Sequence, residues 1–217
     1  MEQQTPRVAD PLTQLKTAWK FLMHNHYAQI AVLVIIVLWV LFTLMKRASM
    51  RKVRELEARA KGGDAVAAAE LGELYEYGEE GAPVNYRQAE RWYRAAASVG
   101  NAAGQNGLGS LYFNGHGMLP NYSDAFKYYE LAAKQGHPLG QANLALLHHR
   151  GKGTSPHPQK AYFWALLAKT NPKSVEIQKR TASFGTFFNE VYNNCPPAQR
   201  EAPEERARTW KPEKKGG

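Results

Sequence analysis

The fold is decided by the stretch Leu71-Gly72-Glu73-Leu74-Tyr75-Glu76-Tyr77-Gly78, because the same pattern occurs three times in the chain. The pattern returns as LGSLYFNG at residues 108–115 and, weakened, as LALLHHRG at residues 144–151. The closing glycines of the three copies are 37 and then 36 residues apart, and a proline follows each of them by five residues. A repeat of this period is the signature of a stacked architecture, in which neighbouring units complete one another's core.

A second block, headed by alanine, follows each proline. It reads AERWY at residues 89–93, AFKYY at residues 125–129 and AYFWA at residues 161–165. Both blocks carry small and apolar residues at helical spacing, and the glycine that ends the first block suits a left-handed helix cap. Each unit is therefore predicted to be a helix-turn-helix pair, and the three pairs are predicted to stack into an α-solenoid.

Large aromatic residues recur at one position of the second block: Trp92, Tyr128 and Trp164. Alanine and glycine at the helix crossings let two backbones approach closely, and one large ring then fills the space beyond them. We expect these three rings to be largely buried, while Arg91, next to Trp92, should face water.

The motif A-x-x-L-G-x-x-Y-x-x-G (68–78), followed by K/Q-A-x-x-W-Y-x-x-A-A-x-x-G (88–100), resembles the Sel-one-like repeat family, relatives of the tetratricopeptide repeats. The resemblance covers half of the chain, with repeats expected at 64–100, 101–136 and 137–171. The third repeat departs from the pattern at Ala145, at His148 and at Asn171-Pro172. The family implies an all-α solenoid with a surface that binds other proteins.

The formal charge of +9 is unevenly distributed along the chain of 217 residues. Residues 1–63 hold 10 basic and 4 acidic side chains, a net of +6, whereas residues 64–217 hold 18 and 15, a net of +3. Nucleic-acid binders concentrate basic residues on the folded domain, so this distribution argues against a nucleic-acid partner. The single cysteine, Cys195, excludes an intrachain disulfide and a metal site built from cysteines.

Residues 27–45 form an uncharged apolar run that is long enough to cross a lipid bilayer. A cleaved signal peptide would have a shorter apolar region and a small-residue cleavage site, so we interpret the run as an uncleaved single span. We therefore expect a membrane-anchored bacterial member of the family.

The two flanks of this span differ in charge. Residues 1–26 are predicted to be a tail, either unstructured or with a short amphipathic helix at the membrane interface. Residues 46–63 are a basic, helix-favouring connector that ends at Gly62-Gly63, before Asp64 caps the first repeat helix. The connector carries the residues predicted to attract anionic lipid headgroups: Lys46, Arg47, Arg51, Lys52 and Arg54.

The charge difference also bears on orientation. By the positive-inside rule the repeats would lie in the cytoplasm, at the inner membrane of a bacterium. The opposite orientation, with the repeats in the periplasm, remains the alternative because members of the family are often exported. The patterning of the repeats is complete by itself, so we expect residues 62–217 to fold without residues 1–45.

The chain after the third repeat is predicted to cap the solenoid. Residues 172–210 hold two candidate helices separated by Pro196-Pro197, and residues 211–217 read as a disordered tail. A terminal cap needs one apolar face toward the stack and one polar face toward water.

No catalytic constellation is predicted, and no cofactor. His148, His149 and His157 invite a metal-dependent enzyme as an alternative, but adjacent helical residues diverge by about 100° and cannot both face one ion. His148 occupies the tyrosine position of the repeat, which favours packing. Cys195 has no histidine or other activating group near it in sequence, and the glycines at 104–109 lie within a repeat helix with no preceding strand, so neither indicates a site.

The functional surface is expected on the inner face of the first helices, between their packing positions. Residues that share a repeat position there form a mixed polar and aromatic stripe suited to a protein partner. The members of this stripe are Glu73, Glu76, Tyr77, Ser110, Phe113, Asn114, Leu146, His149 and Arg150.

Two functions in one broad class follow from these observations. The first is a membrane-anchored scaffold or adaptor that recruits other proteins at a bacterial inner membrane. The second is a periplasm-facing accessory subunit of an envelope or secretion complex. The sequence identifies no partner for either.

Overall fold

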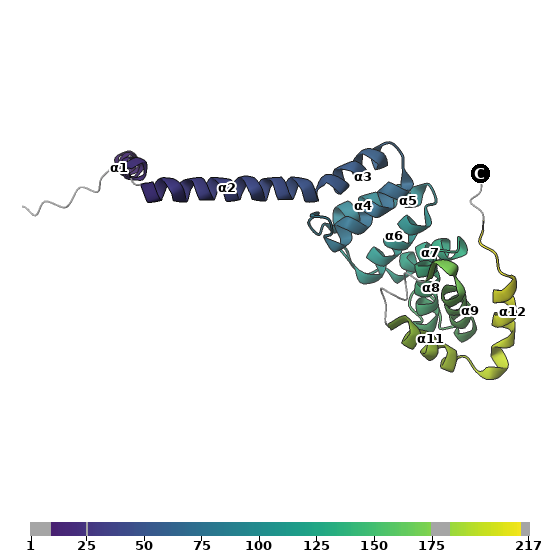
Figure 1. Ribbon diagram of the computed structural model, residues 1–217. Coiled ribbons are helices and arrows are strands. Elements are labelled where there is room, and N and C mark those ends of the chain that lie inside the picture. The colour runs from purple at the N-terminus through teal and green to yellow at the C-terminus, as the bar shows by residue number, and fades with distance from the viewer. Residues whose placement is uncertain (1–9, 25, 175–182, 214–217) are drawn as a thin grey trace, which may run out of the picture. The chain divides into compact units, whose positions relative to one another are not determined.

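The computed structural model describes residues 10–24, 26–174 and 183–213, and all regular structure in these ranges is helical (Figure 1). The chain divides into two compact units, Met1–Ser49 and Met50–Gly217. This confirms the predicted all-α class with three helix-pair repeats.

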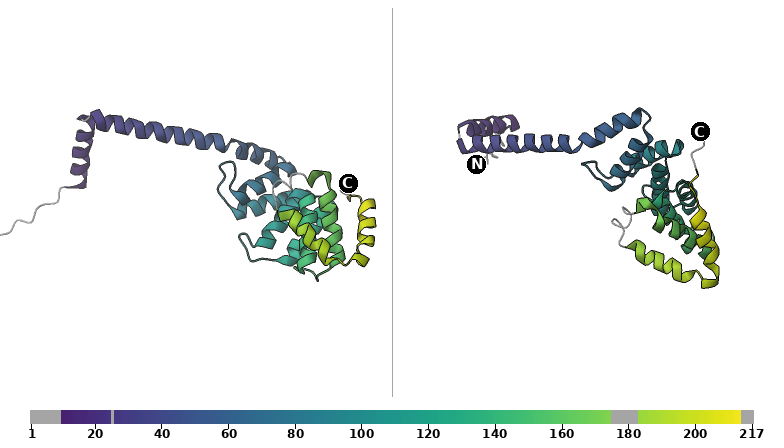
Figure 2. Two further views of the ribbon diagram at one scale, coloured as in Figure 1. Left: turned by 60° about the horizontal axis from the view of Figure 1, so that its bottom comes forward. Right: turned by 45° about the vertical axis from the view of Figure 1, so that its right-hand side comes forward.

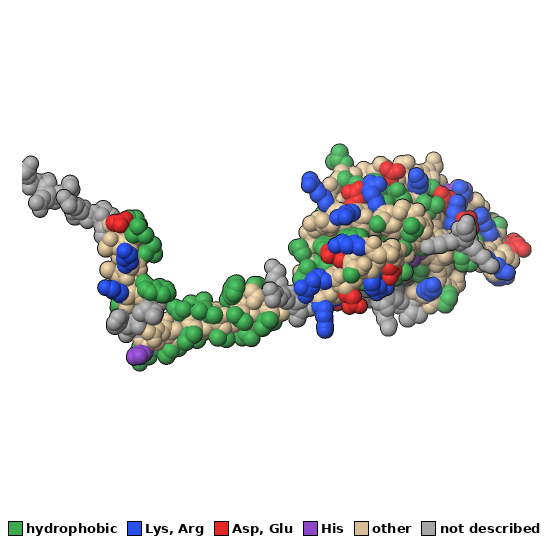
Figure 3. Space-filling view, turned by 90° about the horizontal axis from the view of Figure 1, so that it is seen from above, with side chains coloured by type: hydrophobic (Ala, Val, Ile, Leu, Met, Phe, Trp, Pro, Cys, Tyr) green, Lys and Arg blue, Asp and Glu red, His purple; other side chains and the backbone are tan. Residues whose placement is uncertain are grey.

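The first unit contains α1 (Pro11–His24) and α2 (His26–Ser49). Within α2, residues His26–Met45 have a mean hydropathy of 2.7, and none of the most apolar stretch is buried. Figure 3 shows hydrophobic side chains along the visible surface of this helix. By length and composition, this one described helix suits either a membrane span or a signal sequence.

Three helix pairs form the body of the second unit (Figures 1 and 2). Each helix packs against the next along the chain, so the six helices stack in sequence order. The pairs are α4 (Ala65–Tyr77) with α5 (Tyr86–Ser98), α6 (Ala102–Asn114) with α7 (Tyr122–Lys134), and α8 (Pro138–Arg150) with α9 (Pro158–Thr170).

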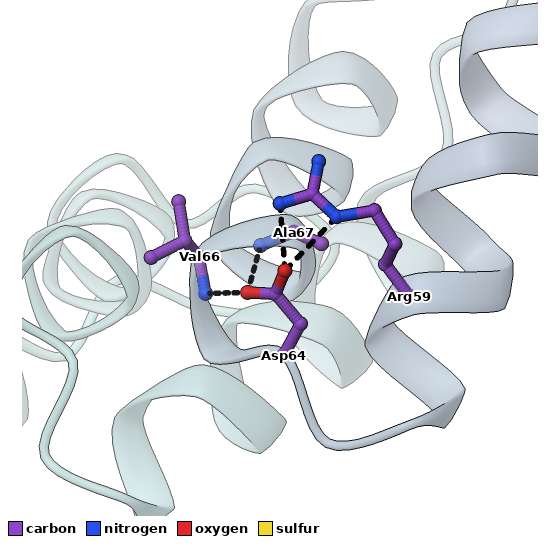
Figure 4. Close-up of polar contacts among 4 residues, drawn as sticks. All are labelled: Arg59, Asp64, Val66 and Ala67. Carbon is purple, nitrogen blue, oxygen red and sulfur yellow. Dashed lines mark hydrogen bonds and ion pairs between the residues drawn. The ribbon is translucent and has the colours of Figure 1, made fainter.

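Both ends of the first repeat helix are closed as the sequence predicts. One carboxylate oxygen of Asp64 accepts the amide protons of Val66 and Ala67 at 2.9 and 3.1 Å, and the other accepts two N–H groups of Arg59 at 2.6 and 3.0 Å (Figure 4). The Ala67 amide first, and then the Arg59 guanidinium, hold the pKa of Asp64 below its usual range. At the other end, Gly78 adopts a left-handed conformation with φ of 73°, which suits glycine.

The joint between the first two repeats is a tyrosine ring held between glycines. A Cβ on Gly72 of α4 would lie 2.4 Å from the ring of Tyr93, and a Cβ on Gly107 of α6 would lie 2.3 Å from it. Gly109 stands in the same relation to Tyr129, at 2.7 Å. These glycines therefore make room for rings that wedge between the helices, as the sequence indicates.

The aromatic prediction holds for the tryptophans and is wrong for Tyr128. Trp92 and Trp164 are 7% and 9% exposed, and Arg91 faces water. Tyr128 is only partly buried, because its ring lies against Tyr112 at the surface, with centroids 5.8 Å apart. The adjacent Tyr129 takes the buried position instead, at 3% exposed.

The predicted connector contains a helix that belongs to the solenoid. In α3 (Arg51–Lys61), Val53 and Leu56 are buried in one core cluster with Leu71 and Trp92. Its basic residues, Arg51, Lys52 and Arg54 among them, remain exposed. Since Val53 and Leu56 share one helix face, α3 covers the N-terminal end of the repeat stack.

The C-terminal region packs against α9. It contains the short helices η1 (Pro172–Ser174) and η2 (Pro197–Gln199) and the helices α11 (Ser183–Asn194) and α12 (Glu201–Thr209). The part of the predicted helix at 175–182, and the tail at 214–217, lie outside the described residues.

Both longer helices bury apolar residues or complete polar pairs against the last repeat. The side chains that α11 and the turn after it bury there are Phe188, Val191 and Cys195. From α9, the hydroxyl of Tyr162 donates to Glu204 of α12 at 2.7 Å. The two helices therefore close the apolar side of α9, as expected of a terminal cap.

Candidate protein-binding groove

A groove of about 1000 Å³ runs along the first helices of the repeats, α4, α6 and α8. It is lined by six of the nine residues that the sequence places on the inner face: Glu73, Glu76, Tyr77, Ser110, Phe113 and Asn114. All six belong to the first two repeats. The structure thus gathers this part of the predicted stripe on one concave surface.

The three members of the stripe from the third repeat lie elsewhere. The imidazole Nε2 of His149 is 3.0 Å from a carboxylate oxygen of Glu190 in α11, and its ring meets Phe187 of the same helix edge-on. Leu146 is partly buried and Arg150 is exposed, and neither lines the groove. Helix α11 therefore occupies part of the face that the third repeat would otherwise contribute.

Glu76 forms the floor of the groove rather than its rim, since it is only 4% exposed. The hydroxyls of Tyr93 and Ser110 donate to its carboxylate at 2.9 and 3.3 Å, and Nδ1 of His116 lies 3.5 Å away. Burial raises the pKa of Glu76 above its usual range, against the opposing effect of these partners. The carboxylate thus joins three successive helices, α4, α5 and α6, beneath the groove surface.

The stripe predicted from the sequence omits some of the residues that line the groove. Glu70 and Asn143 line the groove and lie one helical turn before Glu73 and Leu146. Asn143 also donates to the side-chain carbonyl of Asn106, another lining residue, at 3.0 Å. A signal was present, because residues three positions apart share a helix face.

The groove is acidic. Glu70, Glu73, Glu76 and Glu79 line it, and none of its described lining residues is a lysine or an arginine. The lining histidine, His137, is neutral at physiological pH, because burial lowers its pKa to about 4. Its Nδ1 accepts the amide proton of Gly140 at 3.2 Å, as a neutral ring can. The groove therefore carries a net negative charge in the physiological range.

The histidines of the third repeat are arranged for packing. His148 is 4% exposed, meets Phe126 edge-on, and has its pKa lowered to about 4, with burial as the main cause. Nδ1 of His157 accepts the amide proton of Lys160 at 3.3 Å as a helix cap. Across residues 10–24, 26–174 and 183–213, no three His, Cys, Asp or Glu side chains come together as a metal site would need.

Cys195 lies in the core against the last repeat and is not exposed. Desolvation raises the pKa of its thiol. A raised pKa lowers the fraction of reactive thiolate, so this cysteine has the character of a core residue rather than a nucleophile.

Stacked helix pairs with an inner groove define an α-solenoid of the tetratricopeptide type. The model of the Sel1 repeat matches residues 65–101, 102–137 and 138–171, so the chain is a Sel1 repeat protein with three repeats. Proteins built from Sel1 repeats are generally binding scaffolds without enzymatic activity. No curated protein matches the chain.

Two solved structures resemble the chain. A Sel1 repeat protein from Oxalobacter formigenes shares 29% identity and a TM-score of 0.51, over 58% of this chain and 52% of that one. A protective antigen of uropathogenic Escherichia coli strains, with the same type of fold, shares 23% identity and a TM-score of 0.47, over 70% of this chain and 38% of that one. The chain spans about half of the first structure and less of the second.

Proposed function

We propose that this chain is a membrane-anchored interaction protein that holds a segment of a partner protein in the groove of its first two repeats. The observation that carries the proposal is the groove itself: about 1000 Å³, open to solvent, and lined by aromatic, amide and carboxylate side chains. Such a mixed surface is typical of protein recognition. Membership in a family of interaction proteins supports the same function.

The anchor in this proposal is α2. Its apolar side chains are exposed over the length of a bilayer core, which is costly in water and favourable in lipid. Exposed basic residues of α3 follow it, including Arg51, Lys52 and Arg54. Each basic residue near an anionic membrane contributes about 1 kcal/mol of attraction. This charge favours repeats on the cytoplasmic side of a bacterial inner membrane, with the periplasmic orientation as the alternative.

Fusing alkaline phosphatase after Gly217 tests anchoring and orientation together. We expect the fusion to stay in membranes after an alkaline wash and to be inactive, since the enzyme acts only in the periplasm. Neutral residues in place of Lys46, Arg47, Arg51 and Lys52 should increase its activity by weakening the positive-inside signal. An active fusion of the unaltered chain would establish the periplasmic alternative, and release by the wash would exclude the anchor.

Site-specific photocrosslinking tests the groove. A photoreactive residue at Tyr77 or Asn114, both exposed within the groove, should crosslink a discrete partner in membranes of the native organism. The same residue at Arg87 or Lys127, both exposed on second helices outside the groove, is the matched control. Equal crosslinking from all four positions would show that the groove is not the binding surface.

A further inference from the structure

The charges of the repeat unit are segregated between the first and second helices. The carboxylates that line the groove come from α4 and the turn after it: Glu70, Glu73, Glu76 and Glu79. Exposed cations of the first two repeats lie on α5 and α7 instead, outside the groove: Arg87, Arg91, Arg94 and Lys127. Arg94 is held there by Glu90 at 2.7 Å. None of the described lining residues is a lysine or an arginine; outside the lining, Arg59 of α3 interacts electrostatically with Glu70, and Nζ of Lys152 lies 5.0 Å from the ring of Phe113.

The groove also offers faces for long aliphatic stems. Tyr77 is 58% exposed and the ring of Phe113 is partly buried beside it, while the ring of Tyr129, only 3% exposed, lies beneath this surface. Lysine and arginine side chains bury their methylene stems on apolar surface while their charged ends reach polar partners, and aromatic faces attract the cation itself. An acidic side chain would gain neither contact here.

Amide side chains complete the lining and suit a main chain that has no partners of its own. Asn101, Asn106, Asn114 and Asn143 come from the first two repeats and from α8, so they are distributed along the groove. These amides already make bonds within the protein, Asn101 with Gly104, Asn143 with Asn106 and Asn114 with Ser110. An amide group has two donors and two acceptor lone pairs, so each retains capacity to pair with the N–H and C=O groups of an extended peptide. A helical segment, whose backbone groups are already paired, would not use them.

Resting on the proposed function of this groove, we infer that its occupant is an extended segment rich in lysine or arginine, supplied by a partner protein. Opposite charge would steer the segment into the groove and select it over acidic segments. Glu70, Glu73 and Glu79 provide the charge at the wall, and the aromatic rings receive the stems.

The test uses the full chain in neutral detergent and three fluorescent peptides, built from serine and tyrosine with lysine, glutamine or glutamate at alternate positions. The lysine peptide should bind most tightly and lose affinity as salt is added. Replacing the wall carboxylates in the triple variant Glu70→Gln, Glu73→Gln, Glu79→Gln should weaken its binding about tenfold, as the sum of three partly screened charge contacts.

A matched triple variant separates the local effect from the change in net charge. Glu55→Gln, Glu201→Gln and Glu205→Gln remove three exposed carboxylates that do not line the groove. This variant should bind the lysine peptide within about twofold of the unaltered chain, because exposed charges beyond a screening length contribute little.

The outcomes distinguish this inference from the proposed function. Equal affinity for the three peptides would overturn the charge selection, while position-specific crosslinking from Tyr77 and Asn114 would still support a binding groove. Equal weakening by the two triple variants would also overturn it, by showing attraction to net charge alone. Self-association of the chain that is abolished by the wall variant would identify a second copy as the occupant and exclude a partner's segment.

Discussion

The first two repeats leave their inner face open, whereas the third has its own partly covered by α11. The difference begins at the helix crossing. Tyr93 and Tyr129 wedge their rings against Gly72 and Gly109, but the corresponding residues of the third repeat are Ala165 and Ala145. A methyl group replaces a hydrogen on one helix, and the ring on the other helix is gone.

The consequence of this exchange is seen in the core. Ala145 and Ala165 are fully buried in one cluster with Phe188 and Val191 of α11 and the turn residue Cys195. Apolar side chains from outside the repeat thus share the core of the last repeat. The last repeat of a solenoid can therefore lack the aromatic ring at the helix crossing and pack against a capping helix instead, while the inner face of the earlier repeats stays open to a partner.

The largest expected effect on stability is at the N-terminal end of the first two repeats (the open half), where α3 completes the core. A fragment that starts at Gly62 loses the burial of Val53 and Leu56, each worth about 1.5–3 kcal/mol, whereas one that starts at Met50 keeps it. We expect the shorter fragment to be less stable by about 3–6 kcal/mol in urea unfolding followed by circular dichroism. Equal stability would restore the sequence-based boundary at residues 62–63.

The next effect compares one buried tryptophan of the open repeats with one of the covered repeat. Trp92→Ala in the open half and Trp164→Ala in the covered half should each cost about 3–5 kcal/mol, because both remove a buried aromatic ring. The matched control, Arg91→Ala, removes a cation 5.3 Å from the ring of Trp92 and should cost below about 1 kcal/mol. If the control matched Trp92→Ala in thermal unfolding, the helix phase described above would be wrong.

A reciprocal pair of substitutions tests the joint itself. Gly72→Ala places a methyl group 2.4 Å from the ring of Tyr93 and should cost about 1–3 kcal/mol through overpacking. Ala145→Gly, at the same repeat position, creates no clash and should cost about 1–2 kcal/mol, through helix propensity and the loss of one buried methyl group. Similar costs for both in chemical denaturation would show that the ring does not distinguish the repeats.

The smallest effect concerns acid. Folding lowers the pKa of His137 from its ordinary value of 6.5 to about 4, so between these values the unfolded chain binds more protons than the folded chain. Stability is therefore lost as pH falls through this window, by about 1 kcal/mol at about pH 5.5. Amide hydrogen exchange should report the loss at the start of α8 and not at α4 or α6, which Asp64 and Asn101 cap.

His137→Asn supplies the control for this effect. It places at the start of α8 the cap residue that α6 already uses, and asparagine does not titrate. The variant should keep its protection in mild acid. A pH dependence equal to that of the unaltered chain would assign the effect to another group, such as His148.

The repeats and their caps could be predicted because they depend on local spacing. Asp64 and Gly78 indicate where the first repeat helix begins and ends, and small residues at helical intervals indicate where two helices cross. The covering of His149 could not be predicted, because it depends on where α11 lies, and Phe187 and Glu190 are about 40 residues away in sequence. The packing of α3 on the first repeat could not be predicted for another reason: its two buried residues are surrounded in sequence by charged residues, which suggest a solvated connector.

The burial of Cys195 has a practical consequence. The chain holds a single cysteine, and that thiol is inaccessible and has a raised pKa. The unaltered protein is therefore a nearly silent background for thiol-directed probes. A spin label at Tyr77→Cys paired with one at Asn143→Cys would span the groove between α4 and α8, and electron resonance could then follow its width as an occupant enters.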